Sequence, residues 1–221
     1  MDADAVEIRV LGSLVEKQRT TPDTYPLSLN ALRLACNQAT NRDPVVEYDD
    51  GTIRAALDRL SRKGWTRLAS GPGSRVAKFR HLLEEALGLT PSELALLAVL
   101  MLRGPQTVGE LRTRSERLYP FASTDDVERA LGALAERELV RRLPRRPGQK
   151  EERYAQLLGG EEDTATAAST PPETYAAPAP VTATPADDRV VELEERVDHL
   201  ADQVEWLCKE VVALRDELRT R

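Results

Sequence analysis

Residues 53–65 read IRAALDRLSRKGW, and residues 127–139 read VERALGALAEREL. The two stretches share one apolar pattern at an offset of 74 residues, with four aliphatic residues at helical spacing and a fifth apolar residue at the end. The shared positions are Ile53, Ala56, Leu57, Leu60 and Trp65 in the first copy and Val127, Ala130, Leu131, Leu134 and Leu139 in the second. Such a repeat indicates that one structural unit occurs twice in the chain.

The residues around the first stretch predict two more helices and a β-hairpin. Apolar residues at helical spacing indicate a helix over residues 5–19, and a second helix is expected after Ser28, a favourable N-cap residue. Gly64 is expected to end the third helix in the left-handed conformation. Two short strands, 65–69 and 76–80, then flank a Gly-Pro-Gly turn. Three helices followed by a hairpin is the element order of a winged helix-turn-helix domain.

The same order of signals occurs again in the second copy. Thr90 and Thr107 each stand three residues before a glutamate, a spacing typical of a capping box at a helix start. A third helix is expected to begin near Ser123, and strands over 139–143 and 152–157 flank another turn. That turn repeats the first one, because its Pro-Gly pair recurs at an offset of 75 residues. The sequence therefore predicts a second winged helix-turn-helix domain.

The predicted fold is mainly α with small β-hairpins (α+β), in two tandem winged helix-turn-helix domains over residues 1–88 and 89–158. Residues 159–187 are rich in Ala, Thr and Pro, and such a segment buries too little apolar surface to offset the entropy lost on ordering. We expect a disordered linker there. A coiled-coil helix is predicted to follow over residues 188–221.

The last segment has apolar residues at positions a and d of four successive heptads. Valine at a and leucine at d favour a parallel two-stranded coiled coil, so the sequence predicts a homodimer. The alternative is a single amphipathic helix that docks on the rest of its own chain. The predicted dimerisation residues are Val190, Leu193, Val197, Leu200, Val204, Leu207, Val211 and Leu214.

Composition argues against several functional classes. Two cysteines and two histidines are too few for a disulfide framework or a zinc cluster, and no catalytic constellation is visible. We therefore expect no enzyme activity, no cofactor and no metal. The N-terminus is acidic and lacks the features of a signal peptide, and no apolar run approaches the roughly 20 residues that cross a bilayer. These observations predict a soluble, cytoplasmic protein without a membrane partner.

Charge is unevenly distributed along the chain. The net charge of −6 resolves into +1 for residues 1–88, +2 for residues 89–158 and −9 for residues 159–221. Any contact with DNA must therefore come from local basic patches. In a winged helix, the third helix is expected in the major groove and the hairpin against the DNA backbone. The candidate DNA-binding residues on these elements are Thr52, Arg54, Arg59, Arg62, Lys63, Arg75, Lys78, Arg141, Arg142, Arg145, Arg146 and Lys150.

The third helix of the second domain is a poor candidate for DNA contact, because carboxylates at its solvent-facing positions would repel phosphate. The basic residues of the first domain also have a structural interpretation, in which each pairs with an acidic neighbour. Arg54 and Asp58 have the i,i+4 spacing of such a pair. The solvent-facing positions of the second domain's helix are Asp126, Glu128, Ala133, Glu136 and Arg137.

A polar cluster is expected around the end of the second helix, at Asn30, Asn37, Gln38, Asn41 and Arg42. Side chains of this kind mostly bond backbone groups and close loops, and a surface for a partner or for nucleic acid is the alternative. Cys36 falls on the apolar face of the same helix, where it is expected to be a small core residue.

Residues 21–32 read TPDTYPLSLNAL, and NRDPV follows at residues 41–45. In the second half, LRGPQT at residues 102–107 precedes GELR at residues 109–112. These stretches resemble the signature of the bacterial YceH family, and the resemblance extends over residues 5–158. It implies two winged-helix domains. It implies little about activity, since that family is largely uncharacterised.

Two functions from different classes fit these observations. The first is a dimeric DNA-binding protein, of the transcriptional-regulator or nucleoid-associated type, that uses the third helix of the first domain. The second is an adaptor whose tandem winged helices bind another protein. The fold does not decide between them. The basic helix and hairpins favour DNA, whereas the acidic helix of the second domain and the near-neutral domains favour the adaptor.

Overall fold

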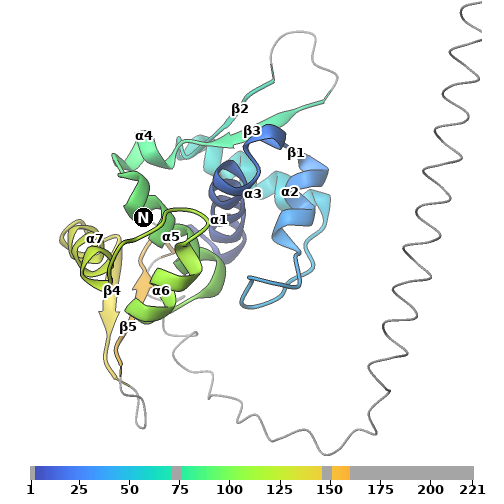
Figure 1. Ribbon diagram of the computed structural model, residues 1–221. Coiled ribbons are helices and arrows are strands. Elements are labelled where there is room, and N and C mark those ends of the chain that lie inside the picture. Colours follow the sequence, from blue (N-terminus) through green and yellow to red (C-terminus); the bar gives the residue numbers. More distant parts are fainter. Residues whose placement is uncertain (1–2, 71–75, 146–150, 160–221) are drawn as a thin grey trace, which may run out of the picture. The chain divides into compact units, whose positions relative to one another are not determined.

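The computed structural model describes residues 3–70, 76–145 and 151–159 (Figure 1). This part of the chain is mainly helical and has two small antiparallel sheets, which confirms the predicted α+β composition. Nearly all of the predicted linker and the whole predicted coiled coil, with its dimerisation residues, lie outside the described residues. Arg75, Arg146 and Lys150 lie outside them as well.

The first half of the fold contains helices whose starts the sequence explains. Asp4, Ser28 and Asp49 have extended N-cap backbones, and each side chain accepts a hydrogen bond from the backbone N–H three residues on. Gly64 follows the third helix with a φ of +74°, the left-handed conformation predicted for it. The elements are α1 (Ala5–Thr20), the 3-10 turn η1 (Pro22–Thr24), β1 (Leu27–Ser28), α2 (Leu29–Cys36), α3 (Asp50–Arg62), β2 (Thr66–Leu68) and β3 (Lys78–His81).

The second half repeats this order of helices and hairpin. Thr90 and Thr107 form the predicted capping boxes, and Ser123 forms a third one with an aspartate in place of the glutamate. The hairpin strands pair antiparallel, with Arg141 opposite Ala155. The elements are α4 (Leu83–Leu87), α5 (Pro91–Arg103), α6 (Val108–Ser115), α7 (Thr124–Glu136), β4 (Val140–Leu143) and β5 (Arg153–Gln156).

Three short elements, η1, β1 and α4, are additions to the predicted order. β1 pairs with the free edge of β3, so that Leu27 lies opposite Phe79 in a sheet of order β1-β3-β2. A two-residue strand has no periodicity from which it could be predicted, because it exists only through its partner strand. α4 connects the two halves, buries Leu83 and ends at Gly88, which has a φ of +56°.

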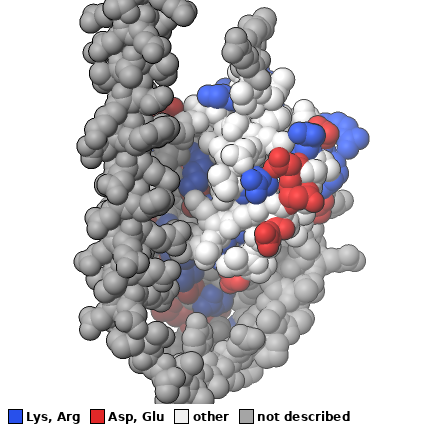
Figure 2. Space-filling view, turned by 90° about the vertical axis from the view of Figure 1, so that its right-hand side faces the viewer, with Lys and Arg blue, Asp and Glu red and all other residues white. Residues whose placement is uncertain are grey.

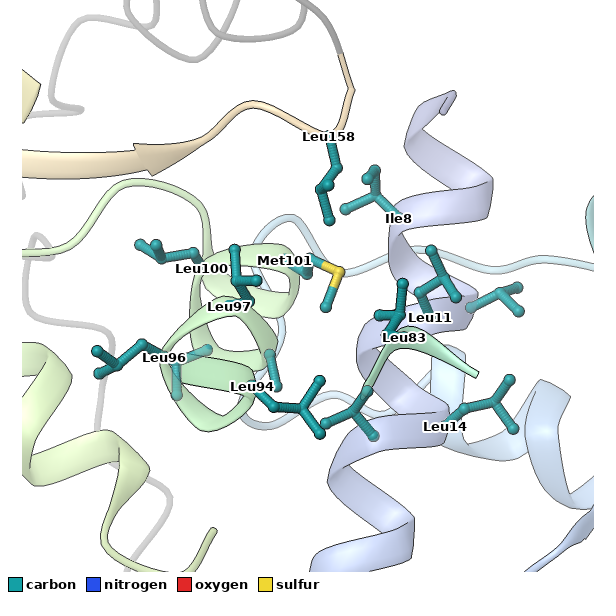
Figure 3. Packing of buried hydrophobic residues seen from close by; sticks show 14 of the residues in the cluster. Ile8, Leu11, Leu14, Leu83, Leu94, Leu96, Leu97, Leu100, Met101 and Leu158 are labelled. Carbon is teal, nitrogen blue, oxygen red and sulfur yellow. The ribbon is translucent and has the colours of Figure 1, made fainter. Parts of the chain in front are cut away.

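α1 and α5 form the centre of the described structure. An amphipathic surface helix buries one stripe, whereas residues 7–15 of α1 and residues 93–102 of α5 are buried on every side. Each helix is enclosed because it packs against the other and against its own half, α1 on α2 and α3, and α5 on α6 and α7 (Figure 1). Figure 3 shows Leu94 and Met101 directed toward α1, while Leu96 points away from it. The two halves therefore share one hydrophobic core.

Gly12 lies where α1 and α5 approach each other closely. A Cβ atom added to Gly12 would lie 2.8 Å from Cγ of Leu102 and 3.1 Å from Cβ of Met101. Both distances are shorter than the carbon–carbon contact of about 3.5–4.0 Å at which dispersion attraction is greatest. The helices can pack at this distance only because residue 12 has no side chain.

The substitution Gly12→Leu is expected to destabilise the protein, since its side chain has no room between the two helices. Overpacking of a core costs about 1–3 kcal/mol, which corresponds to a fall in melting temperature of roughly 2–12 °C for a fold of this size, measured by circular dichroism. Gly132→Ala in α7 is the matched control, because a Cβ there would point into open space, and alanine favours a helix by about 1 kcal/mol. A wild-type melting temperature for Gly12→Leu would contradict this packing.

Candidate nucleic-acid interface

α3 presents the basic residues that the sequence assigns to DNA contact. Its predicted apolar stripe is buried against the core, and Arg54 and Arg62 are exposed on the solvent side. Neither guanidinium has a carboxylate within 4 Å among the residues that the structure describes, so the pair suggested for Arg54 and Asp58 is not formed. Thr52 is half-buried, and its backbone N–H donates to the N-cap carboxylate of Asp49 at 2.6 Å.

Arg59 and Lys63, in contrast, hold α3 to α1. Nη2 of Arg59 lies 2.6 Å from Oδ2 of Asp4, and Nζ of Lys63 lies 2.9 Å from Oε2 of Glu7. Glu7 is only 2% exposed, and it also accepts the backbone N–H of Asp4 in the capping box of α1. These two basic residues therefore have a structural role at the α1–α3 contact, in line with the ion-pair interpretation.

The first hairpin carries more basic residues than the sequence pattern assigned to it. Lys78 is exposed, as expected of a hairpin residue that contacts a partner. Arg67 of β2 and Arg80 of β3 lie directly opposite each other in the sheet, and both are absent from the predicted set. The alternation of Lys78 and Arg80 was a usable signal in the sequence, but the position of Arg67 depends on the strand register.

The basic residues of the second hairpin are partly neutralised within it. Arg142 pairs with Glu152 of the other arm, and Nε of Arg145 lies 3.8 Å from the same carboxylate. Arg141 is half-buried. One carboxylate thus serves two arginines, which leaves this hairpin with a smaller positive charge than its sequence suggests.

α7 differs from α3 in its surface chemistry, as the sequence predicts. Asp126 closes the capping box at the start of the helix, and Ala133 is half-buried. Arg137 reaches back to the carbonyl groups at the end of α4 and lies 3.7 Å from a carboxylate oxygen of α5. Glu128 and Glu136 are exposed. α7 therefore presents carboxylates at its surface where α3 presents arginines.

The candidate residues do not form one continuous surface. α3 and the β4–β5 hairpin lie on opposite sides of the central α1–α5 pair (Figure 1). Figure 2 shows the face on the right-hand side of Figure 1, where basic and acidic residues are interspersed and much of the surface carries neither charge. The basic residues of α3 are therefore separated from those of the second hairpin.

The polar cluster after α2 closes the loop between α2 and α3. Nδ2 of Asn37 donates to the carbonyl of Tyr48 at 2.8 Å, and Oδ1 of Asn37 accepts the N–H of Tyr48 at 2.9 Å. Arg42 is fully buried, and its Nη2 lies 2.5 Å from Oε2 of Glu16 in α1. Arg9 of α1 donates to the carbonyl of Cys36 at the end of α2 and to that of Pro44 within the loop. These bonds favour the structural interpretation of the cluster.

Burial accounts for the titratable groups whose pKa is shifted most. Burial lowers the pKa of His81 to about 4. Nδ1 of His81 accepts the N–H of Leu83 at 3.3 Å, so Nε2 carries the proton and donates to Oε1 of Gln18 at 2.6 Å. Burial also raises the pKa of Cys36 to about 11, as befits the core residue that the sequence predicts. These are packed core positions and not reactive groups.

A hollow of about 460 Å³ lies beside the start of α5 and the surface of α7. Tyr119 and Phe121 form an edge-to-face pair with centroids 4.9 Å apart in its wall. No motif in the sequence predicted it, and its signal is the aromatic pair around a proline. The lining residues are Thr90, Ser92, Glu93, Tyr119, Pro120, Phe121, Ala122, Asp126, Arg129, Ala130 and Ala133.

The fold and these surfaces define a class of small α+β protein, built from two helix-and-hairpin units with basic side chains on α3 and on both hairpins. None of the helices that the structure describes is long and apolar enough to span a bilayer.

Comparison with known proteins places the chain in a family. A family model described as "Protein of unknown function, DUF480" matches residues 3–149. A UPF0502 protein of Geotalea daltonii is 59% identical over 170 residues, which cover 76% of this chain and 78% of that protein. UPF0502 proteins of Citrifermentans bemidjiense and Azotobacter vinelandii are 57% and 51% identical, over 72% of this chain and 75% and 71% of their own lengths. The chain belongs to the DUF480 family of bacterial proteins.

The buried His81 is expected to make the protein less stable as the pH falls. The unfolded chain binds a proton at this residue near pH 6.5, whereas the folded protein does so only near pH 4. The stability is therefore fully present above pH 6.5 and declines between pH 6.5 and pH 4. Urea unfolding at about pH 7 and about pH 5 should show a loss of about 2 kcal/mol from this group. His81→Gln should lose correspondingly less, and a loss equal to that of the wild type would contradict this assignment.

Proposed function

We propose that this protein is a non-catalytic DNA-binding protein that contacts double-stranded DNA through the outward face of α3. The observation that carries this proposal is the exposure of Arg54 and Arg62 without a carboxylate partner in the described part of the chain. Gly51 and Ala55 are also exposed on α3 and have no bulk. The helix surface beside the two arginines is therefore low enough for close approach to a groove. Phosphate neutralisation by such arginines supplies most of the affinity for DNA.

We take α1–α3 with the β2–β3 hairpin, and α5–α7 with the β4–β5 hairpin, as two winged helix-turn-helix domains. The repeated element order and the repeated helix caps support this assignment. We also take the family to be the one that the sequence resemblance names YceH. The corresponding role is that of a cytoplasmic transcriptional regulator or nucleoid-associated protein.

The ion pairs between α3 and α1 limit which residues take part. Arg59 and Lys63 are held by Asp4 and Glu7, and a phosphate would have to displace these carboxylates. Arg54 and Arg62 are free of that competition among the described residues. The two domains are also close to neutral. We therefore expect modest affinity that falls steeply with salt.

The double substitution Arg54→Glu/Arg62→Glu is expected to weaken binding by roughly tenfold or more, because two phosphate contacts are replaced by repulsion. Binding is measured by fluorescence anisotropy of a labelled duplex at low salt. Arg59→Glu is unsuitable as the test. It would place a third carboxylate beside Asp4 and Glu7 and loosen α3 from α1.

Arg112→Glu/Arg117→Glu is the matched control for this experiment. Both residues are exposed in the second half, and the double substitution changes the net charge by the same amount. The control should bind like the wild type, and both variants should keep the wild-type melting temperature. Equal loss in the control, or no loss in the α3 variant, would contradict the proposed site.

An adaptor is the second candidate function. It is favoured by the hollow beside α7, whose aromatic wall and neighbouring exposed carboxylates suit a protein side chain better than a phosphate. In that case the wild type should bind no duplex even at low salt. A partner captured from lysate should then survive nuclease treatment and be lost when the hollow is blocked by Ala133→Trp.

We also propose that the protein is a homodimer through the heptads of residues 188–221. The support is the unbroken valine and leucine pattern. Light scattering at micromolar concentration should give the mass of two 24.5 kDa chains. Leu200→Glu/Leu207→Glu should give the mass of one chain, because charges would enter the seam, whereas Asp202→Lys at an outward position should not. A wild-type mass of one chain would favour the docked helix.

A further inference from the structure

In the first unit, a charged contact joins the start of the first helix to the third helix. Nη2 of Arg59 lies 2.6 Å from Oδ2 of Asp4, and its Nε lies 3.5 Å from Oε1 of Glu7. Nζ of Lys63 lies 2.9 Å from Oε2 of Glu7. The carboxylate of Glu7, which closes the capping box of α1 and is only 2% exposed, therefore has two cations within 4 Å.

The second unit keeps only part of this contact. Glu93 closes the capping box of α5 as Glu7 closes that of α1. The 74-residue repeat places Arg137 at the position of Lys63, and Nη1 of Arg137 lies 3.7 Å from Oε2 of Glu93. Among the residues that the structure describes, Glu93 has this one cation within 4 Å, whereas Glu7 has two.

The second unit has alanine at the position of Arg59. The repeat aligns Arg59 with Ala133, and Thr90 begins the capping box of α5 as Asp4 begins that of α1. Thr90, Glu93 and Ala133 all line the hollow of about 460 Å³ beside α7. The hollow therefore lies at the place where the guanidinium of Arg59 fills the first unit.

The carboxylate of Glu93 is buried, and one of its oxygens is not engaged. The side chain is only 8% exposed. Oε2 accepts the backbone N–H of Thr90 at 2.7 Å and its hydroxyl at 3.0 Å, and the contact with Arg137 is to the same oxygen. Oε1 has no hydrogen-bond or ion-pair partner in the described part of the chain. A buried charge is costly unless it is paired and hydrogen-bonded, so this oxygen favours a cationic donor.

The rest of the hollow fits the side chain of an arginine. Tyr119 and Phe121 form its aromatic wall, and guanidinium groups stack on aromatic rings. Ala133 is small and half-buried, which leaves room for the aliphatic stem that arginine packs against apolar surface. Asp126 and Arg129 also line the hollow, but they pair with each other.

The position at a helix start does not exclude a cation. The dipole of a helix disfavours positive charge at its N-terminus, yet Arg59 lies at the start of α1 beside the carboxylates of Asp4 and Glu7. Glu93 supplies a carboxylate at the start of α5. An apolar side chain is the alternative occupant, and it would leave Oε1 of Glu93 without a partner. The observations therefore favour arginine.

We propose that the hollow of the second unit binds an arginine side chain of a partner protein. The guanidinium donates to Oε1 of Glu93 and lies against the aromatic wall, as a substitute for the arginine that the first unit has in its own chain. Asp125 and Glu136 are exposed and flank the lining residues of α7 at helical spacing, so they attract a basic segment around that arginine. This inference goes beyond the DNA contact of α3. It rests on the adaptor, the second candidate function, and names the chemistry of its partner.

The test is a titration of the full chain with N-acetyl-arginine amide, followed by NMR spectroscopy of the backbone amides. The signals of Glu93, Phe121 and Ala133 should shift and saturate. N-acetyl-citrulline amide has nearly the same shape without the charge, and it should bind about tenfold more weakly because the charge-assisted hydrogen bond is lost. N-acetyl-lysine amide should also bind more weakly, since an ammonium group has no planar face to stack.

Two variants and one control locate the binding site. Ala133→Arg should fill the hollow from within the chain, keep at least the wild-type melting temperature and lose the saturable shifts. Glu93→Gln should weaken binding about tenfold, and it decides the matter if Ala133→Arg lowers the melting temperature, because glutamine also closes a capping box. Glu128→Gln makes the same change in charge at an exposed position of α7 outside the hollow. This control should bind like the wild type.

Several outcomes would overturn the inference. These are the absence of saturable shifts in the wild type, equal affinity for the arginine and citrulline amides, and unchanged binding by Glu93→Gln. Tighter binding of N-acetyl-leucine amide would assign the hollow to an apolar side chain instead. Shifts of the same signals with protein concentration alone would assign it to a second copy of the chain.

The adaptor function is judged separately, by the capture of a partner that Ala133→Trp abolishes. If such a partner is found while the wild type does not bind the arginine amide, the adaptor stands and only this inference is overturned. If neither is found, both are overturned.

Discussion

Gly12 permits a contact between α1 and α5 that leaves no space for a side chain, and both helices are buried on every side as a result. The rest of the described structure is arranged around this pair (Figure 3). α1 carries α2 and α3, and α5 carries α6 and α7. Each central helix depends on its neighbours, because residues on every side of it are buried. The two repeated units are therefore held together by their first helices, and α3 is fixed on the side away from the second hairpin (Figure 1).

The two units keep one core pattern and differ at their surfaces. Their third helices bury the same stripe of aliphatic residues, yet α3 exposes Arg54 and Arg62 where α7 exposes Glu128 and Glu136. Both units keep the same fold because both keep the same core pattern, and a packed core tolerates little change. Surface residues are free to change, because they are not constrained by packing. This divergence is consistent with the proposed use of α3, and not of α7, for DNA contact.

Local signals in the sequence were sufficient for most of the secondary structure. The side chains of Asp49, Thr90 and Thr107 accept hydrogen bonds from backbone groups three residues on, and Gly64 ends α3 through its own left-handed φ. Short segments of sequence therefore contain enough information to predict these helix ends. β1 escaped prediction because two residues become a strand only beside β3. The candidate site could be predicted only in part. The sequence shows which residues are basic, but it does not show which of them lie beside a carboxylate in the fold. Arg67 was not predicted for the same reason, because only the strand register places it opposite Arg80.

The sequence by itself determined the order of the six longer helices and the two hairpins, most of their starts and ends, and the repeat at 74 residues, because these depend on interactions within one or two turns of chain. Only the tertiary structure decided which basic residues remain available. Arg59 is bound to Asp4 across 55 residues of sequence, and Lys63 to Glu7 across 56, whereas Arg54 and Arg62 point elsewhere. Burial likewise decided the pKa of His81. Charge pairing and burial are set by contacts between distant segments, and only the packing of α1 against its neighbours creates those contacts.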